Sequence, residues 1–491
     1  MSNVSDPASL PSTAVSDDGV VDDPLELSLL QNMSLNLRDS TDHELCTAPF
    51  FTRDVYELAR PRASFPQRGL LGSVIEVFDK NGPCKNHECK DSRVYFNTNA
   101  PCSTLVCGVQ GSGKSHTVSI LLENMLIPKY PSIGVLEKPL SGLVLHFGEG
   151  GPYTQPCEAA WLGLSRIASV KPPRVRVFVS SSSLETMKAV YAPLGANITV
   201  EPLLFSEAEL DAQAFLSMMA IGASDHVPLY MQTVLSILRE LGEKYTYQEF
   251  INRLAAKKTK FVPAQLAGLE QRMALLESFL DKKTSRKSRA KPPRFAAGQL
   301  TIVDLSDPFI DPASACGFFE IITRLFVRAK VDTGKVLVVD EAHKARSISL
   351  ASRYLSDLLL SLIRQQRHQS MRVIISTQEP TVVPPVLIGL CSITILHRFS
   401  SPAWWNHVAK HIAADVDHNE AFDKVVNLQT GQAIVLAPAG MGVSTIPSTK
   451  TPEREYKASK SLQQFGRKCV LIKTRQRVST DGGASLLVVD V

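Results

Sequence analysis

The chain has 491 residues, which is enough to bury a large core and to form more than one folding unit. Its hydrophobic fraction of 44% and charged fraction of 21% are ordinary for a globular protein in water, and no stretch approaches the roughly 20 apolar residues that cross a bilayer. The first residues lack the basic start and apolar core of a secretory signal, and the nine cysteines are scattered. We therefore expect reduced thiols, no membrane span and a location in the cytoplasm or nucleus.

Residues 1–48 are rich in Ser, Asp, Pro and Asn and show little periodicity, which predicts a disordered acidic arm. Within residues 1–50, nine acidic side chains stand against the single Arg38, a balance of −8 that leaves +13 on the rest of a chain whose net charge is +5. The leucine-rich segment 25–37 is compatible with a short helix that binds a partner. A positive balance over the rest of the chain is compatible with binding to a polyanion such as DNA. Most surface charge, however, only keeps a protein hydrated.

Residues 49–445 are predicted to form one α/β domain. Strands are expected at 69–78 and 92–97, and the apolar, β-branched run 103–107 is typical of a buried strand. A helix is expected over 115–127, because its apolar pattern ends at a proline.

A complete phosphate-binding loop lies between that strand and that helix, Gly108-Val-Gln-Gly-Ser-Gly-Lys-Ser115. Its glycines let backbone N–H groups surround the β-phosphate, and the helix N-terminus adds positive potential. Lys114 is expected to reach the β- and γ-phosphates, and the Ser115 hydroxyl to bind Mg²⁺. The sequence therefore predicts ATP and Mg²⁺ as cofactors. The residues expected to hold the nucleotide are Gly108, Gln110, Gly111, Ser112, Gly113, Lys114, Ser115 and His116.

Further strands are predicted at 141–147, 174–179 and 198–204, followed by a helical insertion over about 206–295 with apolar stripes at helical spacing. The insertion ends in the basic run 282–294. This run is compatible with contacts to phosphates, with a nuclear import signal or with a solvated loop tip.

A second motif completes a hydrolytic site. The strand predicted at 335–339 ends in Asp340 and Glu341. Asp340 is expected to hold Mg²⁺ through its water shell opposite Ser115, and Glu341 to polarise the attacking water as general base. The next strand, 371–377, ends in Gln378, whose amide can bind both the γ-phosphate and that water. An ATPase is the predicted enzyme class.

Together these motifs resemble the HerA–FtsK superfamily of hexameric, nucleic-acid-pumping ATPases, over roughly residues 68–440. The resemblance implies a RecA-like P-loop NTPase fold with a central, mostly parallel sheet. It also implies a homo-hexamer that acts on DNA, in which Arg364 or Arg367, one turn apart on a helix, enters a neighbour's site as a catalytic finger. The family commonly has Arg where this chain has Glu379.

Residues 446–491 are predicted to form a polar connector and a C-terminal β-hairpin, with strands at 468–473 and 484–490. Two functions other than a DNA motor stay open: a nucleotide-dependent switch or scaffold and, less favoured, a small-molecule kinase. Glu149, after the strand at 141–147, is expected either near the γ-phosphate or in a surface loop.

A group of cysteine and histidine residues near the phosphate loop raises the question of zinc. No C-x₂-C pair occurs among them, so ordinary thiols are expected instead. The group consists of Cys84, His87, Cys89, Cys102 and Cys107.

Overall fold

The computed structural model describes residues 43–59, 64–84, 90–151, 153–219, 229–281, 292–342, 350–446 and 459–482. Nearly all of the predicted acidic arm, most of the basic run and the strand expected at 484–490 lie outside these residues, as do His87 and Cys89. Within the described part of the chain, no helix has both the length and the apolar character needed to cross a membrane.

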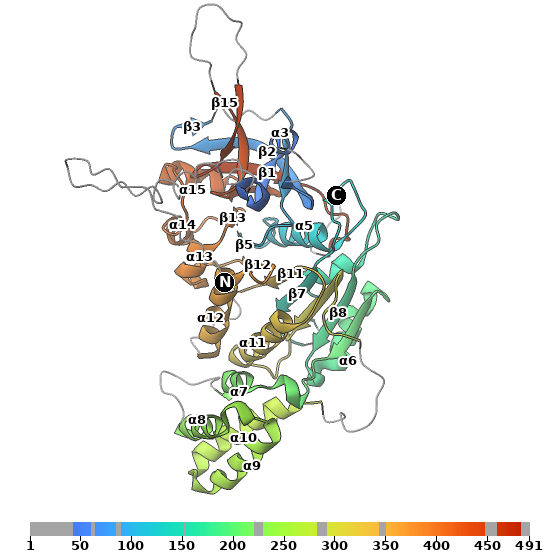
Figure 1. Cartoon of the computed structure of the whole chain (residues 1–491), viewed down its shortest axis with the longest axis vertical. Helices are drawn as coiled ribbons and strands as arrows, with labels where there is room; N and C mark the ends of the chain where they lie inside the picture. Colours follow the sequence, from blue (N-terminus) through green and yellow to red (C-terminus); the bar gives the residue numbers. More distant parts are fainter. Residues whose placement is uncertain are drawn as a thin grey trace, which may run out of the picture.

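A mostly parallel sheet forms the centre of the molecule (Figure 1). The parallel strands lie in the spatial order β9-β8-β10-β7-β11-β12-β5-β13. The strand before the phosphate loop, β5, thus lies beside β12, and β12 separates it from β11. This is the RecA-like order of P-loop NTPases, so the predicted fold class is confirmed. The bounds are β5 Cys102–Cys107, β7 Ser141–His146, β8 Arg174–Val179, β9 Ile198–Pro202, β10 Gln299–Asp304, β11 Lys335–Val339, β12 Met371–Thr377 and β13 Ile393–Leu396.

Helices bury both faces of this sheet, which explains why its strands are almost continuously apolar. On β11, Leu337 packs into one core and the next residue, Val338, into the other. Helices α5 and α6 cover the Val338 face, and α11 and α12 cover the Leu337 face. Their bounds are α5 Lys114–Leu126, α6 Leu184–Tyr191, α11 Pro312–Arg328 and α12 Leu350–Gln365.

The expected helical insertion forms one end of the molecule (Figure 1). It joins the Leu337-face core, because α7 packs against α11 and α12. Its helices are α7 Ala212–Met219, α8 Leu229–Leu241, α9 Tyr247–Lys257 and α10 Pro263–Ser278.

Antiparallel strands extend the sheet beyond β13 in the order β14-β17-β2-β4. Both edges of β17 are paired, so β17 has no free edge for the expected hairpin with residues 484–490. Residues 445–462, expected to form a polar connector, instead include the end of β15 and most of β16, which pair with each other. The bounds are β1 Phe50–Thr52, β2 Arg68–Asp79, β3 Gly82–Pro83, β4 Arg93–Phe96, β6 Gly134–Val135, β14 Gln432–Leu436, β15 Met441–Ile446, β16 Ser459–Gln464 and β17 Cys469–Thr474.

Short helices complete the described fold. One precedes β2, and three lie between β12 and β14, on the chain that returns to the sheet edge. They are α3 Arg53–Leu58, α13 Pro385–Leu390, α14 Pro402–Ala409 and α15 His418–Val426.

Candidate nucleotide site

The phosphate loop joins β5 to α5 in a conformation that requires its glycines. Gly111 and Gly113 have φ of 74° and 106°, a region that side chains with a Cβ rarely adopt. Gly108 has no room for a Cβ, which would lie 2.5 Å from Ser112 Oγ and 2.7 Å from His397 Cβ. The backbone of the loop therefore requires glycine at the three positions where the sequence motif has glycine.

His397 was not predicted as a site residue. It is buried next to the phosphate loop and contacts the first turn of α5. Its Nδ1 lies 3.0 Å from the carbonyl oxygen of Gln432, and its Nε2 lies 2.9 Å from Thr117 Oγ1. A carbonyl only accepts, so Nδ1 carries the proton and Nε2 accepts from the threonine hydroxyl. Burial lowers the pKa of His397 to about 4, and the positive charge of Lys114 acts in the same direction.

Three predicted catalytic residues meet at the carboxyl edge of the sheet. Lys114 opens α5, Glu341 follows β11 and Gln378 follows β12. Lys114 Nζ donates to Glu341 Oε1 at 2.9 Å, and Gln378 Nε2 donates to both carboxylate oxygens at 3.2 and 3.1 Å. Lys114 is only 4% exposed and Glu341 11%, so the ion pair is largely shielded from water. Residues separated by more than 200 positions thus form one polar cluster.

The backbone at Glu341 is strained. Its φ of 52° places a non-glycine residue in the left-handed region, at a cost of about 1–2 kcal/mol. Hydrogen bonds on either side fix it: Asp340 N donates to Leu145 O and Ala342 N to Ser376 O, both at 3.0 Å. Such strain concentrates at functional positions, where the surrounding structure holds it.

Asp340 lies beside the cluster as an ionised carboxylate. Burial raises its pKa, but the close contact with His146 Nδ1 at 3.4 Å and the positive charge of Lys114 outweigh burial and hold the pKa at about 2. Asp340 and Ser115 line one cavity of about 500 Å³, together with Glu149. Hydroxyl and carboxylate oxygens are the ligands that Mg²⁺ prefers, so these residues fit the ion.

A larger share of the predicted nucleotide residues lines a second cavity of about 440 Å³. Gly108 and Ser112 lie behind its wall and shape the loop instead. The phosphate loop, the start of α5, Glu341 and Gln378 form one part of the lining; the remaining lining residues were not predicted as site residues. The lining residues are Val109, Gln110, Gly111, Gly113, Lys114, Ser115, His116, Glu158, Glu341, Gln378, Thr430, Gly431, Thr474, Arg475, Gln476 and Asp481.

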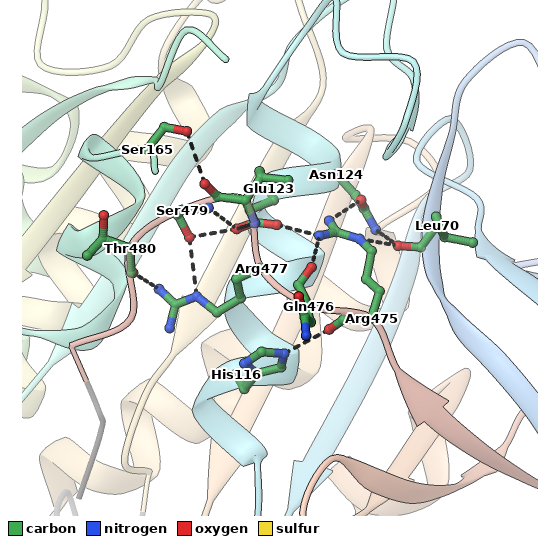
Figure 2. A network of polar contacts seen from close by, with 11 residues as sticks. Leu70, His116, Glu123, Asn124, Ser165, Arg475, Gln476, Arg477, Ser479 and Thr480 are labelled. Carbon is green, nitrogen blue, oxygen red and sulfur yellow. Dashed lines mark hydrogen bonds and ion pairs between the residues drawn. The ribbon is translucent and has the colours of Figure 1, made fainter. Parts of the chain in front are cut away.

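Part of the remaining lining comes from residues 475–481, here called the C-terminal strap, which cross α5 after β17 (Figure 2). The buried carboxylate of Glu123 on α5 anchors the strap. Its Oε1 accepts from Val478 N at 3.0 Å and from Ser479 N at 2.8 Å, and its Oε2 accepts from Arg475 Nη1 at 2.7 Å.

Arg475 joins the strap to two further elements. Its Nη2 donates to Asn124 Oδ1 at 2.9 Å and its Nε to Leu70 O on β2 at 2.8 Å (Figure 2). The carbonyl oxygen of Arg475 accepts from His116 Nε2 at 2.8 Å. His116, expected to contact the nucleotide, therefore also fixes the cavity wall.

The two predicted finger arginines lie elsewhere. Arg364 is exposed in the last turn of α12, which ends at Gln365, and Arg367 is exposed in the turn that leads into β12. The expectation that both lie on the helix is therefore corrected: the chain must turn there to enter the strand. Both lie at the amino edge of the sheet, roughly 20 Å from the carboxyl end of β12, and neither lines the two cavities.

The chain matches no family model and no curated protein. Similar solved structures include VirB4 of Thermoanaerobacter pseudethanolicus, with 12% identity, a TM-score of 0.41, and coverage of 83% of this chain and 97% of that one. The bacterial conjugative coupling protein TrwB has 13% identity and a TM-score of 0.41, over 83% of this chain and 91% of its own. The genome packaging NTPase B204 from Sulfolobus turreted icosahedral virus 2, in complex with AMP, has 10% identity and a TM-score of 0.27, over 69% and 92%.

Proposed function

We propose that this protein binds ATP with Mg²⁺ and hydrolyses it. The observation that carries the proposal is the meeting of Lys114, Glu341 and Gln378 beside a phosphate loop whose glycines adopt the conformation that such a loop needs. A cation, a carboxylate and an amide at one point supply phosphate binding, a general base and a group that orients water.

The roles follow from position. Lys114 binds the β- and γ-phosphates, and Ser115 with Asp340 holds Mg²⁺, which neutralises charge on the phosphates. Glu341 takes a proton from the attacking water, and Gln378 positions that water. The nucleoside extends from the loop into the 440 Å³ cavity, against Thr474 and the C-terminal strap.

The ion pair between Lys114 and Glu341 indicates a coupled rearrangement. Lys114 cannot remain fully paired with the carboxylate while it binds a γ-phosphate, so nucleotide binding is expected to release Glu341. If Glu341 becomes free to act as a base only when a γ-phosphate binds Lys114, hydrolysis occurs only when the site holds a triphosphate.

We propose further that hydrolysis drives movement on DNA by a ring of identical subunits. Two observations support this: the basic balance of the chain beyond residue 50, and the exposure of Arg364 and Arg367 at the edge of the sheet opposite their own site. From that position neither arginine lines its own subunit's cavities, so a catalytic role requires the site of another subunit.

The effect of DNA on turnover tests this step. Phosphate release from Mg²⁺-ATP by the full chain is expected to rise several-fold with double-stranded DNA and to lose that stimulation at high salt, because phosphate contacts are screened. Hydrolysis that DNA leaves unchanged at all salt concentrations would contradict the motor and favour a nucleotide-dependent switch or scaffold.

A further inference from the structure

A cysteine, a histidine and an aspartate converge at the wall of the 500 Å³ cavity. One ring nitrogen of His146, the thiol of Cys157 and a carboxylate oxygen of Asp340 all lie within 4.8 Å of one another. Within the described residues, this is the one group of three or more such side chains close enough to share a metal ion.

The local geometry approaches that of a tetrahedral metal site. His146 Nδ1 lies 3.4 Å from Asp340 Oδ2. Bonds of about 2.0–2.3 Å to zinc separate neighbouring ligand atoms by roughly 3.3–3.6 Å, so this pair already has the required spacing. Nδ1 is buried and has no properly aligned hydrogen-bond partner among the described residues. A buried nitrogen without a hydrogen-bond partner calls for an explanation, and coordination of a metal ion by His146 Nδ1 would supply one.

Three separate elements fix the ligands. His146 ends β7 and Asp340 follows β11, the neighbouring parallel strand. The backbone N–H of Cys157 donates to the hydroxyl of Tyr191 at 3.0 Å, and that hydroxyl donates to the buried Asp304 Oδ2 at 2.6 Å. These hydrogen bonds fix the backbone that carries the thiol, which favours metal binding.

Access to the group comes from the side of the nucleotide. His146 and Asp340 line the 500 Å³ cavity, whereas Cys157 is 1% exposed and lies behind them. A metal ion entering through the cavity would meet three protein ligands and keep a fourth position for water.

We propose that His146, Cys157 and Asp340 bind Zn²⁺, and that Zn²⁺ bound there inhibits ATP hydrolysis by withdrawing Asp340 from Mg²⁺. A thiolate and an imidazole select Zn²⁺ over Mg²⁺, which prefers oxygen ligands. On binding, the Cys157 thiol and the His146 imidazolium each lose a proton to solvent, and a Zn–S and a Zn–N bond form. The inhibition rests on the proposed function; the binding does not.

Cobalt binding to the full chain, freed of metals by a chelator, tests the site directly. Co²⁺ replaces Zn²⁺ in tetrahedral sites, and a thiolate ligand gives a charge-transfer absorption band. We expect this band in the wild type, its bleaching by Zn²⁺, and its loss in Cys157→Ser. It should persist in Cys84→Ser, a control whose partly exposed thiol lies beside Asp79. His146→Ala should weaken binding by about tenfold or more.

Turnover in excess Mg²⁺ tests the inhibition. One equivalent of Zn²⁺ is expected to lower ATP hydrolysis by the wild type and by Cys84→Ser but not by Cys157→Ser, whose basal turnover stays unchanged. Absence of the band in the wild type, or an identical band in folded Cys157→Ser, would overturn the zinc site while leaving the ATPase intact. A band from a chain without ATPase activity would uphold the site and overturn the proposed function.

Discussion

At the scale of single residues, Glu341 has the central position, because its carboxylate accepts hydrogen bonds from both Lys114 and Gln378. The sequence predicted this convergence, since the three residues follow a loop and two buried strands whose carboxyl ends meet at one edge. It did not predict the left-handed backbone of Glu341 or the ion pair, because both depend on the folded arrangement of β7, β11 and β12.

Glu341→Gln should separate binding from chemistry. Glutamine keeps the size of the side chain and its contact with Lys114 but cannot accept the proton. We expect ATP affinity to change little while hydrolysis falls by about 10² or more. Calorimetric titration with ATP and a phosphate-release assay measure the two effects. Loss of affinity as large as that in Lys114→Ala would mean that Glu341 has a structural role.

His397 gives a pH dependence with a defined sign. Its pKa falls from 6.5 to about 4 on folding, so the unfolded chain binds more protons between these values. The stability contributed by neutral His397 is present above pH 6.5 and is lost as pH falls towards 4, by roughly 3 kcal/mol in total.

Urea unfolding at neutral and mildly acidic pH checks this expectation. His397→Asn retains a donor for the Gln432 carbonyl but cannot titrate. It should be less stable than the wild type at neutral pH, and its stability should fall less on acidification. Equal acid sensitivity of the two proteins would exclude His397 as the source.

At the scale of elements, the C-terminal strap supplies part of the wall of the 440 Å³ cavity from the last described part of the chain. Glu123 and Arg475 are 352 positions apart, yet they form a buried ion pair at 2.7 Å. Residues 475–481 show no periodic pattern and no motif, so the strap could not be predicted from the sequence.

The central strands were predictable because continuous apolar runs between turn residues indicate strands buried on both faces.

Glu123→Gln should loosen the strap, since it leaves the Arg475 guanidinium buried without a negative partner. Breaking a buried pair costs about 3–5 kcal/mol, so we expect a lower melting temperature, weaker ATP binding and faster proteolysis within 475–481. Glu185→Gln is the matched control, because Glu185 pairs with Lys188 on the surface, where such pairs contribute little. Identical behaviour of the two variants would show that the strap does not depend on Glu123.

Two features of the secondary structure were not predicted correctly: the end of the helix before Arg367 and the pairing of the C-terminal strands. Helical spacing predicted that Arg367 continues α12, but the helix ends at Gln365 because the chain must reverse into β12. The strand at 469–474 was predicted, whereas its two neighbours, β14 and β2, come from distant parts of the sequence. Local patterns carry no information on such pairing.

At the scale of the whole molecule, the ring proposal makes each site depend on two subunits. We expect hexamers in the presence of nucleotide by light scattering and a turnover per subunit that rises with protein concentration. An arginine supplied by a neighbour is worth about 10³ or more in rate. Arg364→Ala or Arg367→Ala should therefore abolish most activity while ATP binding persists.

Mixing two inactive variants tests the shared site. Subunits with Lys114→Ala lack a working loop but keep their arginines, and Arg367→Ala subunits have the reverse defect, so a mixture should regain part of the activity. A strictly monomeric chain with full, concentration-independent turnover would contradict the ring and leave the switch.

The proposed function requires that this chain hydrolyses ATP at the site formed by Lys114 and Glu341. Phosphate release from Mg²⁺-ATP by purified wild type, Lys114→Ala and Lys188→Ala measures it most directly. Lys188 is a suitable control because it lies on the surface, paired with Glu185. We predict turnover in the wild type and in Lys188→Ala, and none above background in Lys114→Ala, which also binds ATP more weakly. Undiminished hydrolysis by Lys114→Ala, or no hydrolysis by the wild type with or without DNA, would contradict the proposed function.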